Sequence, residues 1–147
     1  MGWIAINILL PAVAPLIMMT FYLPFRSRLP EQSKKLVRYI TALKDGQLCW
    51  AGIAYCAAGL YEMHEARGRP AAHGLGSYDG VVETGFILLL VANGAIAAGG
   101  AGGAVFPVEP PCPPWQEPWK YYAALSWSVG LASVAGLVFA LVHFIIA

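Results

Sequence analysis

The sequence predicts an all-α integral membrane protein whose four transmembrane helices form one bundle. The chain of 147 residues is 59% hydrophobic. Only 12% of its residues are charged, whereas soluble domains carry about 25% charged residues. Apolar residues gather in long segments separated by polar or proline-rich ones. We therefore expect a single polytopic domain over residues 1–147, with spans at about 3–25, 46–63, 84–106 and 121–146.

The first predicted span, residues 3–25, contains no charged side chain and exceeds the roughly 20 residues that a bilayer requires. A cleaved signal peptide is the alternative, because residues 12–14 read Ala-Val-Ala, as at a cleavage site. A retained span is favoured, since no positive residue precedes the run and the run is too long for such a peptide. Pro11 and Pro15 predict a kink that frees backbone carbonyls near the middle of the membrane.

A basic segment follows the first span. Apolar residues at helical spacing predict an amphipathic helix over residues 31–45. We expect it to continue as one helix from about 30 to 66, roughly 55 Å long, whose excess length projects as a basic cytoplasmic stalk. The alternative is a surface helix, a bend at Asp45-Gly46 and a short tilted span. The basic residues expected at the membrane surface are Arg26, Arg28, Lys34, Lys35 and Arg38.

The second span carries a face of small side chains. Gly52, Cys56 and Gly59 recur at spacings of four and three, so they share one side of a helix. Such a face usually packs against another helix. Cys49 and Cys56 lie on the same side, but two ligands do not make a tetrahedral metal site. We therefore expect structural cysteines and no metal.

The segment from residue 64 to 83 is polar and rich in glycine, and it is the one concentration of histidine and carboxylate groups in the sequence. No recognised metal-binding or catalytic spacing occurs there. We expect solvated loop and helix-end residues, with no catalytic, metal-binding or cofactor-binding role. His64, Glu65 and His73 are the first residues to test for any such role.

The third span contains two adjacent ridges of small residues, each repeating every four positions. They comprise Gly94, Ala98 and Gly102 and, one residue further on, Ala95, Gly99 and Gly103. Such small-xxx-small ridges let helix backbones approach closely. Asn93 heads a third small row, and an amide in hydrocarbon has to face protein or water. An interhelical hydrogen bond is the favoured interpretation of Asn93, and a pore-lining position is the alternative.

Residues 107–118 contain six prolines and predict a stiff, extended strap between the last two spans. A proline-rich docking peptide is the alternative, and Cys112 is a lesser candidate for acylation. In the fourth span a further small ridge runs through Ala132, Gly136 and Ala140. His143 follows near its end, where we expect a packing role.

The distribution of Lys and Arg residues among the loops predicts how the chain is oriented in the membrane. The three loops between the spans carry six, two and one Lys or Arg residues in chain order. The positive-inside rule then places the first and third loops in the cytoplasm and both termini outside, in what we expect to be a bacterial inner membrane. A net charge of +1 gives no reason to expect a nucleic-acid partner.

Two functional classes remain once enzymes and transporters are set aside. The spans contain no nucleophile–base pair and no buried charged residue of the kind that marks chemistry or transport. We expect no enzyme and no cofactor. The favoured function is a self-associating membrane protein that forms a pore or perturbs the bilayer, as a holin or toxic effector does. The alternative is an accessory, assembly or immunity subunit that binds another membrane protein. No motif assigns the chain to a family.

Overall fold

The computed structural model describes residues 2–22, 43, 46–68, 76–105 and 122–146. Within these ranges every element is a helix and no strand occurs, so the predicted all-α class is confirmed for them. The long helices are α5 (Leu48–Arg67), α6 (Asp79–Val105) and α8 (Ala123–Ile146). The N-terminal helix consists of α1 (Gly2–Ile4), a π-helical turn (Ala5–Leu9) and α2 (Leu10–Tyr22). A short 3-10 helix (Gly76–Tyr78) leads into α6.

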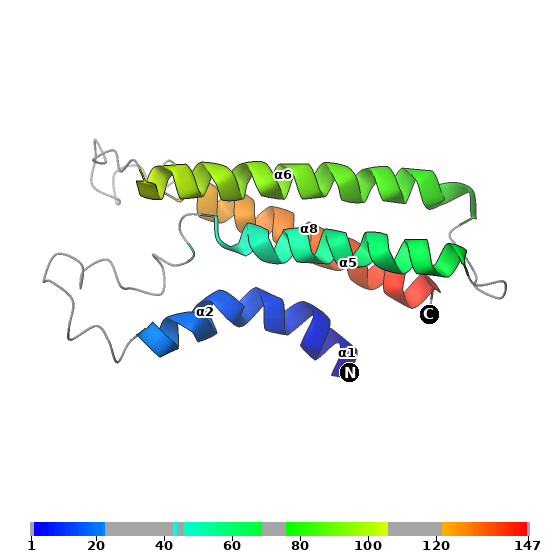
Figure 1. Ribbon diagram of the computed structural model, residues 1–147, viewed down its shortest axis with the longest axis horizontal. Helices are drawn as coiled ribbons and strands as arrows, with labels where there is room; N and C mark the ends of the chain where they lie inside the picture. Colours follow the sequence, from blue (N-terminus) through cyan, green and yellow to red (C-terminus); the bar gives the residue numbers. More distant parts are fainter. Residues whose placement is uncertain (1, 23–42, 44–45, 69–75, 106–121, 147) are drawn as a thin grey trace, which may run out of the picture.

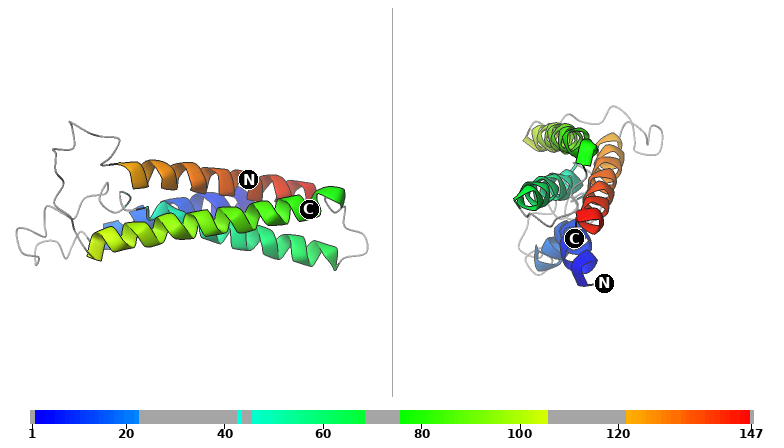
Figure 2. Two further views of the ribbon diagram at one scale, coloured as in Figure 1. Left: turned by 90° about the horizontal axis from the view of Figure 1, so that it is seen from above. Right: turned by 90° about the vertical axis from the view of Figure 1, so that its right-hand side faces the viewer.

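The three long helices run up and down beside one another, and α5 contacts both α6 and α8 extensively (Figure 1). Seen from the end they form a triangle, with the N-terminal helix on the side away from α6 (Figure 2). The beginning of α1 and the end of α8 lie at the same end of the bundle. One long side of α6 is therefore covered by no other described helix.

The N-terminal helix is irregular where proline interrupts its hydrogen bonding. Pro11 and Pro15 have no backbone N–H to donate, and the wide turn Ala5–Leu9 stands directly before Pro11. The Leu10 N–H donates to the Ala5 carbonyl, five residues back, as expected of a π-helical turn. Such turns bend a helix and expose carbonyls to other partners.

The prediction of one continuous helix from 30 to 66 is wrong at its centre. Gly46 has a φ of +76°, in the left-handed region that a right-handed helix does not enter. The chain turns there, and α5 begins only at Leu48. The bend at Gly46 agrees with the alternative prediction. Apart from Leu43, the stalk lies outside the described residues, as does the proline strap at 107–118.

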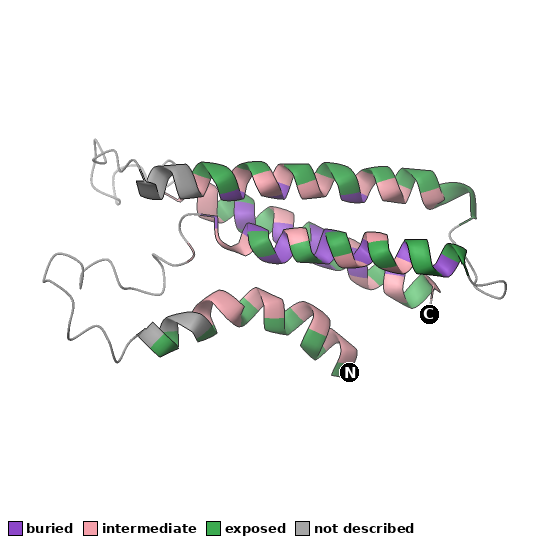
Figure 3. Cartoon of the chain, in the orientation of Figure 1, coloured by how far each residue is buried: buried purple, intermediate pink, exposed green. Residues whose placement is uncertain are grey.

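Buried residues follow the sides on which the long helices face one another, and exposed residues cover the outer sides (Figure 3). Asn93, Ser128, Cys49 and Cys56 are fully buried, beside Phe86 and Phe139. Large apolar side chains that are more than half exposed include Leu88, Val91, Trp127, Leu137 and Phe144. Many exposed large apolar side chains are typical of a surface that contacts lipid or another protein.

Within the described residues, two helices are long and apolar enough to cross a membrane. These are the stretch from Gly76 to Gly100 and the helix from Ala123 to Ile146. The apolar N-terminal stretch Gly2–Ile17 is shorter, and α5 ends in charged residues. The structure thus supports two potential spans, and the four-span bundle stays a prediction.

Candidate helix-packing site

Gly52 of α5 faces the side chain of Asn93 on α6. A Cβ atom at Gly52 would overlap the Asn93 side-chain amide, so this position accepts only glycine without rearrangement. Asn93 is fully buried, and its Nδ2 donates to the Leu89 carbonyl of its own helix at 2.8 Å. Its Oδ1 accepts no hydrogen bond from the described residues and points at the Gly52 backbone. A Cα–H donor at that point compensates a buried oxygen only weakly.

The same arrangement recurs two turns along, where Gly59 receives the ring of Phe86. A Cβ at Gly59 would overlap the tip of this fully buried ring. Seven residues separate Gly52 from Gly59, and seven separate Phe86 from Asn93 in the opposite direction. A seven-residue repeat in both helices is the spacing of coiled-coil-like packing. Two residues of α6 thus occupy the inner face of α5, by which we mean Gly52, Cys56 and Gly59.

The small ridge of α8 receives a side chain in the same way. A Cβ at Gly136 would lie 3.2 Å from the ring of Tyr55, which comes from α5. The Tyr55 hydroxyl continues past α8 and donates to the Ile8 carbonyl of the N-terminal helix at 2.6 Å. Tyr55 therefore joins three segments of the chain at one point.

The second small-residue face lies on the side of α6 that no other described helix covers. A Cβ atom added at the half-exposed Gly94 or at the exposed Gly99 would meet no atom of the described residues within 4 Å. Ala95, Ala98 and Gly99 are exposed, whereas Ala97 on the inner row is buried. We call Gly94, Ala95, Ala98 and Gly99 the outer face of α6. Gly102 and Gly103 continue its pattern within the helix, and their packing lies outside what the structure describes, as do the basic residues Arg26, Arg28, Lys34, Lys35 and Arg38.

The polar segment predicted at 64–83 divides into separate contacts. The Nη2 of Arg67 donates to Glu83 Oε2 at 2.6 Å, and its Nε lies 3.7 Å from Asp79 Oδ2. The hydrogen bond to Glu83, followed by its charge, raises the pKa of Arg67. The contacts of Arg67 therefore join the end of α5 to the start of α6. His64 and Glu65 are exposed.

His73 lies outside the described residues. Among those that are described, no group of three or more His, Cys, Asp or Glu side chains is placed to hold a metal ion.

A polar contact that sequence reasoning missed joins Glu62 to His143. The His143 Nδ1 lies 3.1 Å from each carboxylate oxygen of Glu62. Trp3 stacks on the imidazole with ring centroids 3.7 Å apart and planes inclined by 10°. The three residues lie far apart in the chain. The order of the predicted spans could have indicated this contact, because Trp3, Glu62 and His143 each lie near a span end on the same side of the bundle.

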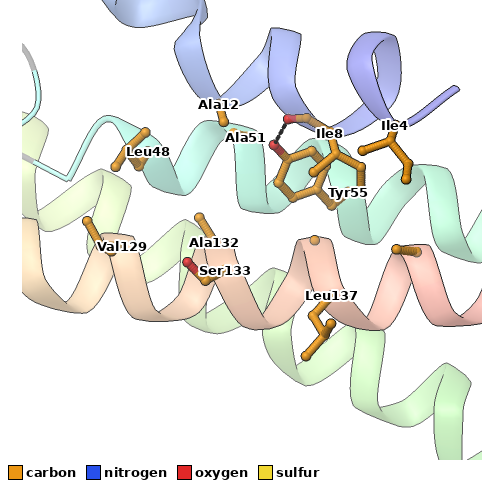
Figure 4. Close-up of a pocket in the computed structure, with 12 residues that line it drawn as sticks. Ile4, Ile8, Ala12, Leu48, Ala51, Tyr55, Val129, Ala132, Ser133 and Leu137 are labelled. Atoms are coloured by element: carbon orange, nitrogen blue, oxygen red, sulfur yellow. Dashed lines mark hydrogen bonds between the residues drawn. The ribbon is translucent and has the colours of Figure 1, made fainter. Parts of the chain in front are cut away.

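A cavity of about 410 Å³ separates the N-terminal helix from α5 and α8 (Figure 4). Ile4, Ile8 and Ala12 line one wall, and residues of the other wall include Ala51, Ala132 and Ser133. Its lining is almost wholly apolar, and none of the described residues that line it is charged. It is therefore a gap in packing without convergent polar groups.

Comparison of the sequence with protein-family models, with curated proteins and with solved structures gives no match.

Proposed function

We propose that the protein is a small polytopic membrane protein that self-associates through the outer face of α6, and that its oligomer forms a pore or perturbs the bilayer. The main support is a contrast between glycines that pack against a side chain of another helix and glycines that do not. Gly52, Gly59 and Gly136 each receive a side chain from within the chain, while no described residue comes within 4 Å of a Cβ atom added at Gly94 or Gly99.

Self-association follows from the energetics of helices in lipid. Large apolar side chains gain little by leaving lipid for protein, so close backbone contact and hydrogen bonding drive association there. The outer face of α6 offers such contact, since its Gly94, Ala95, Ala98 and Gly99 present no long side chain. Two copies of α6 meeting on this face would approach as closely as α5 and α6 do within one chain.

The same proposal places four spans in a bacterial inner membrane, with both termini outside and the first and third loops cytoplasmic. Asn93 is buried against Gly52 inside the protomer. A pore between protomers would therefore be lined by faces other than that of Asn93, unless the bundle rearranges.

A second candidate is an accessory, assembly or immunity subunit that uses the outer face of α6 to bind a different membrane protein. The same empty ridge favours it, because small-residue faces serve contacts between unlike helices equally well. In both candidates the protein is no enzyme and uses no cofactor.

Expression of the chain alone separates the two candidates. Membrane potential and growth are followed for the wild type, for Gly99→Leu and for Gly130→Leu as the matched control. Gly130 is likewise exposed with open space around it, but lies on α8. Depolarisation that Gly99→Leu abolishes and Gly130→Leu preserves would support the pore.

Harmless expression, with no conductance from purified protein in planar bilayers, would refute the pore and leave the subunit function. Self-association is measured separately, by energy transfer between labelled copies in vesicles. A protein that remains monomeric at every protein-to-lipid ratio would refute the oligomer itself.

A further inference from the structure

The cavity between the N-terminal helix, α5 and α8 is elongated along the helices (Figure 4). On α8 its lining runs from Val129 to Ala140, which is a length of about 16 Å at 1.5 Å per residue. The N-terminal helix lines it from Ile4 to Ala12 and so extends along most of this length. The shape of the cavity therefore suits a long, thin ligand better than a round one.

One side of the cavity opens to the outside of the bundle, in the part of the chain that the structure describes. Val129, Ser133 and Leu137 recur every four residues, so they form one row on the surface of α8. All three are exposed. Ala51 and Ala132 are buried and form the inner wall. A ligand can therefore enter from the side, along the exposed row of α8.

The chemistry of the lining favours hydrocarbon over water or a charged group. The polar side chains among the lining residues are those of Tyr55 and Ser133, and none is charged. The Tyr55 hydroxyl already donates to the Ile8 carbonyl at 2.6 Å. A water molecule in a cavity needs two to four polar partners, and a buried charge needs a counterion or several hydrogen bonds. Hydrocarbon needs neither.

The size of the cavity agrees with one acyl chain. A methylene group fills about as much space as a water molecule does in the liquid, about 30 Å³, so the cavity of about 410 Å³ would hold about a dozen of them. An extended run of a dozen methylenes is about 15 Å long, because carbon–carbon bonds of about 1.5 Å meet at tetrahedral angles. Volume and length therefore lead to the same ligand.

We infer that the cavity is a binding site for one acyl chain of a membrane phospholipid. The inference rests on the membrane location given under the proposed function. Val129 comes six residues after the start of α8 and Ala140 six residues before its end, so the cavity lies at the middle of this helix. At that depth a bilayer offers acyl chains, since its headgroups lie beyond the hydrocarbon core. Bound there, the chain would contact both Ile8 and Ala132 and complete the packing of the N-terminal helix.

Photo-crosslinking tests the site on the full protein in phosphatidylcholine vesicles. A small fraction of the lipid is phosphatidylcholine that carries a diazirine at the middle of one acyl chain, and peptide mass spectrometry locates the adducts after illumination. Leu88 is exposed on α6 and reports contact with ordinary surrounding lipid. Ala51 and Ala132 are buried, so adducts there require a chain inside the cavity. We expect adducts at all three positions.

A filled cavity should lose the lipid. Ala132→Leu adds three carbons to the inner wall, and overpacking of this kind corresponds to a loss of affinity of about fivefold or more. The ratio of adducts at Ala51 to adducts at Leu88 should fall by that factor. Gly130→Leu is the matched control, because it adds a leucine two residues away on α8 at an exposed position that does not line the cavity. It should leave the ratio unchanged. If Ala132→Leu fails to fold, Ala12→Leu fills the cavity from the opposite wall and should lower the ratio in the same way.

Adducts confined to exposed residues, with none at Ala51 or Ala132, would overturn the site. So would a ratio that both cavity-filling variants leave unaltered. A ratio that falls when palmitic acid is added would overturn the phospholipid as the ligand and assign the cavity to a free fatty acid. Extraction of the vesicles with alkaline carbonate keeps the two proposals apart. Release of the protein would refute the membrane location itself, whereas a retained protein with an unlabelled cavity would refute the lipid site alone.

Discussion

The inner face of α5 and the outer face of α6 have similar compositions and opposite surroundings. Both present glycine and other small residues at helical spacing. On α5, Gly52 and Gly59 receive Asn93 and Phe86 so closely that no Cβ fits. On α6, Gly94 and Gly99 face open space. Small residues in a helix thus mark where a neighbour can come close, but they do not say whether that neighbour belongs to the same chain.

Position in the bundle explains the difference. The helix α5 lies against α6, α8 and the N-terminal helix, so it has described neighbours on several sides (Figures 1 and 2). The helix α6 packs with one side only, the row of Phe86, Asn93 and Ala97. The inner face of α5 is therefore expected to determine the stability of the protomer. The outer face of α6 is expected to determine association.

The largest effect is expected from Gly59→Leu on the inner face. The new side chain would collide with the Phe86 ring, which is fully buried. Overpacking of this kind costs about 1–3 kcal/mol and often more when backbones have to separate. Unfolding in mixed micelles by increasing SDS would show the loss of stability. Equal stability of Gly59→Leu and Gly99→Leu would remove the contrast between the two faces.

A double-mutant cycle sharpens the account of the Gly52–Asn93 contact. Gly52→Ala should destabilise the protomer, because its Cβ overlaps the Asn93 amide. Asn93→Ala vacates that space, so Gly52→Ala should cost little in its background. Residues in contact show coupling energies of about 0.5–3 kcal/mol. SDS unfolding of the four proteins measures it. A coupling near zero would mean that Asn93 does not occupy the space at Gly52.

Tyr55→Phe tests the boundary between α5 and the N-terminal helix. It removes the hydrogen bond to the Ile8 carbonyl and retains the ring against Gly136. A hydrogen bond between membrane helices contributes about 0.6 kcal/mol on average. Hydrogen exchange should therefore quicken in the N-terminal helix and remain unchanged at the contact between α5 and α6. Uniform quickening across the chain would show that Tyr55 supports the whole bundle.

The smallest effect on the protomer is expected from Gly99→Ala on the outer face. Alanine there meets no atom within 4 Å and has the higher helix propensity, by about 1 kcal/mol in soluble helices. SDS unfolding should show unchanged or slightly higher stability. Gly99→Leu should preserve the protomer as well but weaken energy transfer between labelled copies. A loss of protomer stability in Gly99→Ala would show that this face packs against another part of the same chain.

The sequence was informative about helices and much less so about their partners. The low charge and the apolar runs predicted an all-α chain. The boundaries of α8 and the end of α6 lie within two residues of those of the predicted spans, whereas α6 starts five residues earlier than predicted, at Asp79. The break before α5 was misjudged, because no proline or other strong stop signal separates the amphipathic segment 31–45 from the apolar residues that follow Gly46. Glycine tolerates helical and left-handed conformations alike, so its presence did not decide between them.

The candidate site shows the same division. Helical spacing alone places Gly52, Cys56 and Gly59 on one face and the two ridges of α6 on another, because 3.6 residues per turn fixes which side chains share a side. Spacing does not say which side of α6 faces the bundle. Tertiary packing decided this: it buried the row of Phe86, Asn93 and Ala97 and left the two ridges outside. Equally, only folding could bring Trp3, Glu62 and His143 together. Spacing along a chain specifies directions around one helix axis, whereas contacts between helices depend on how several axes are placed at once.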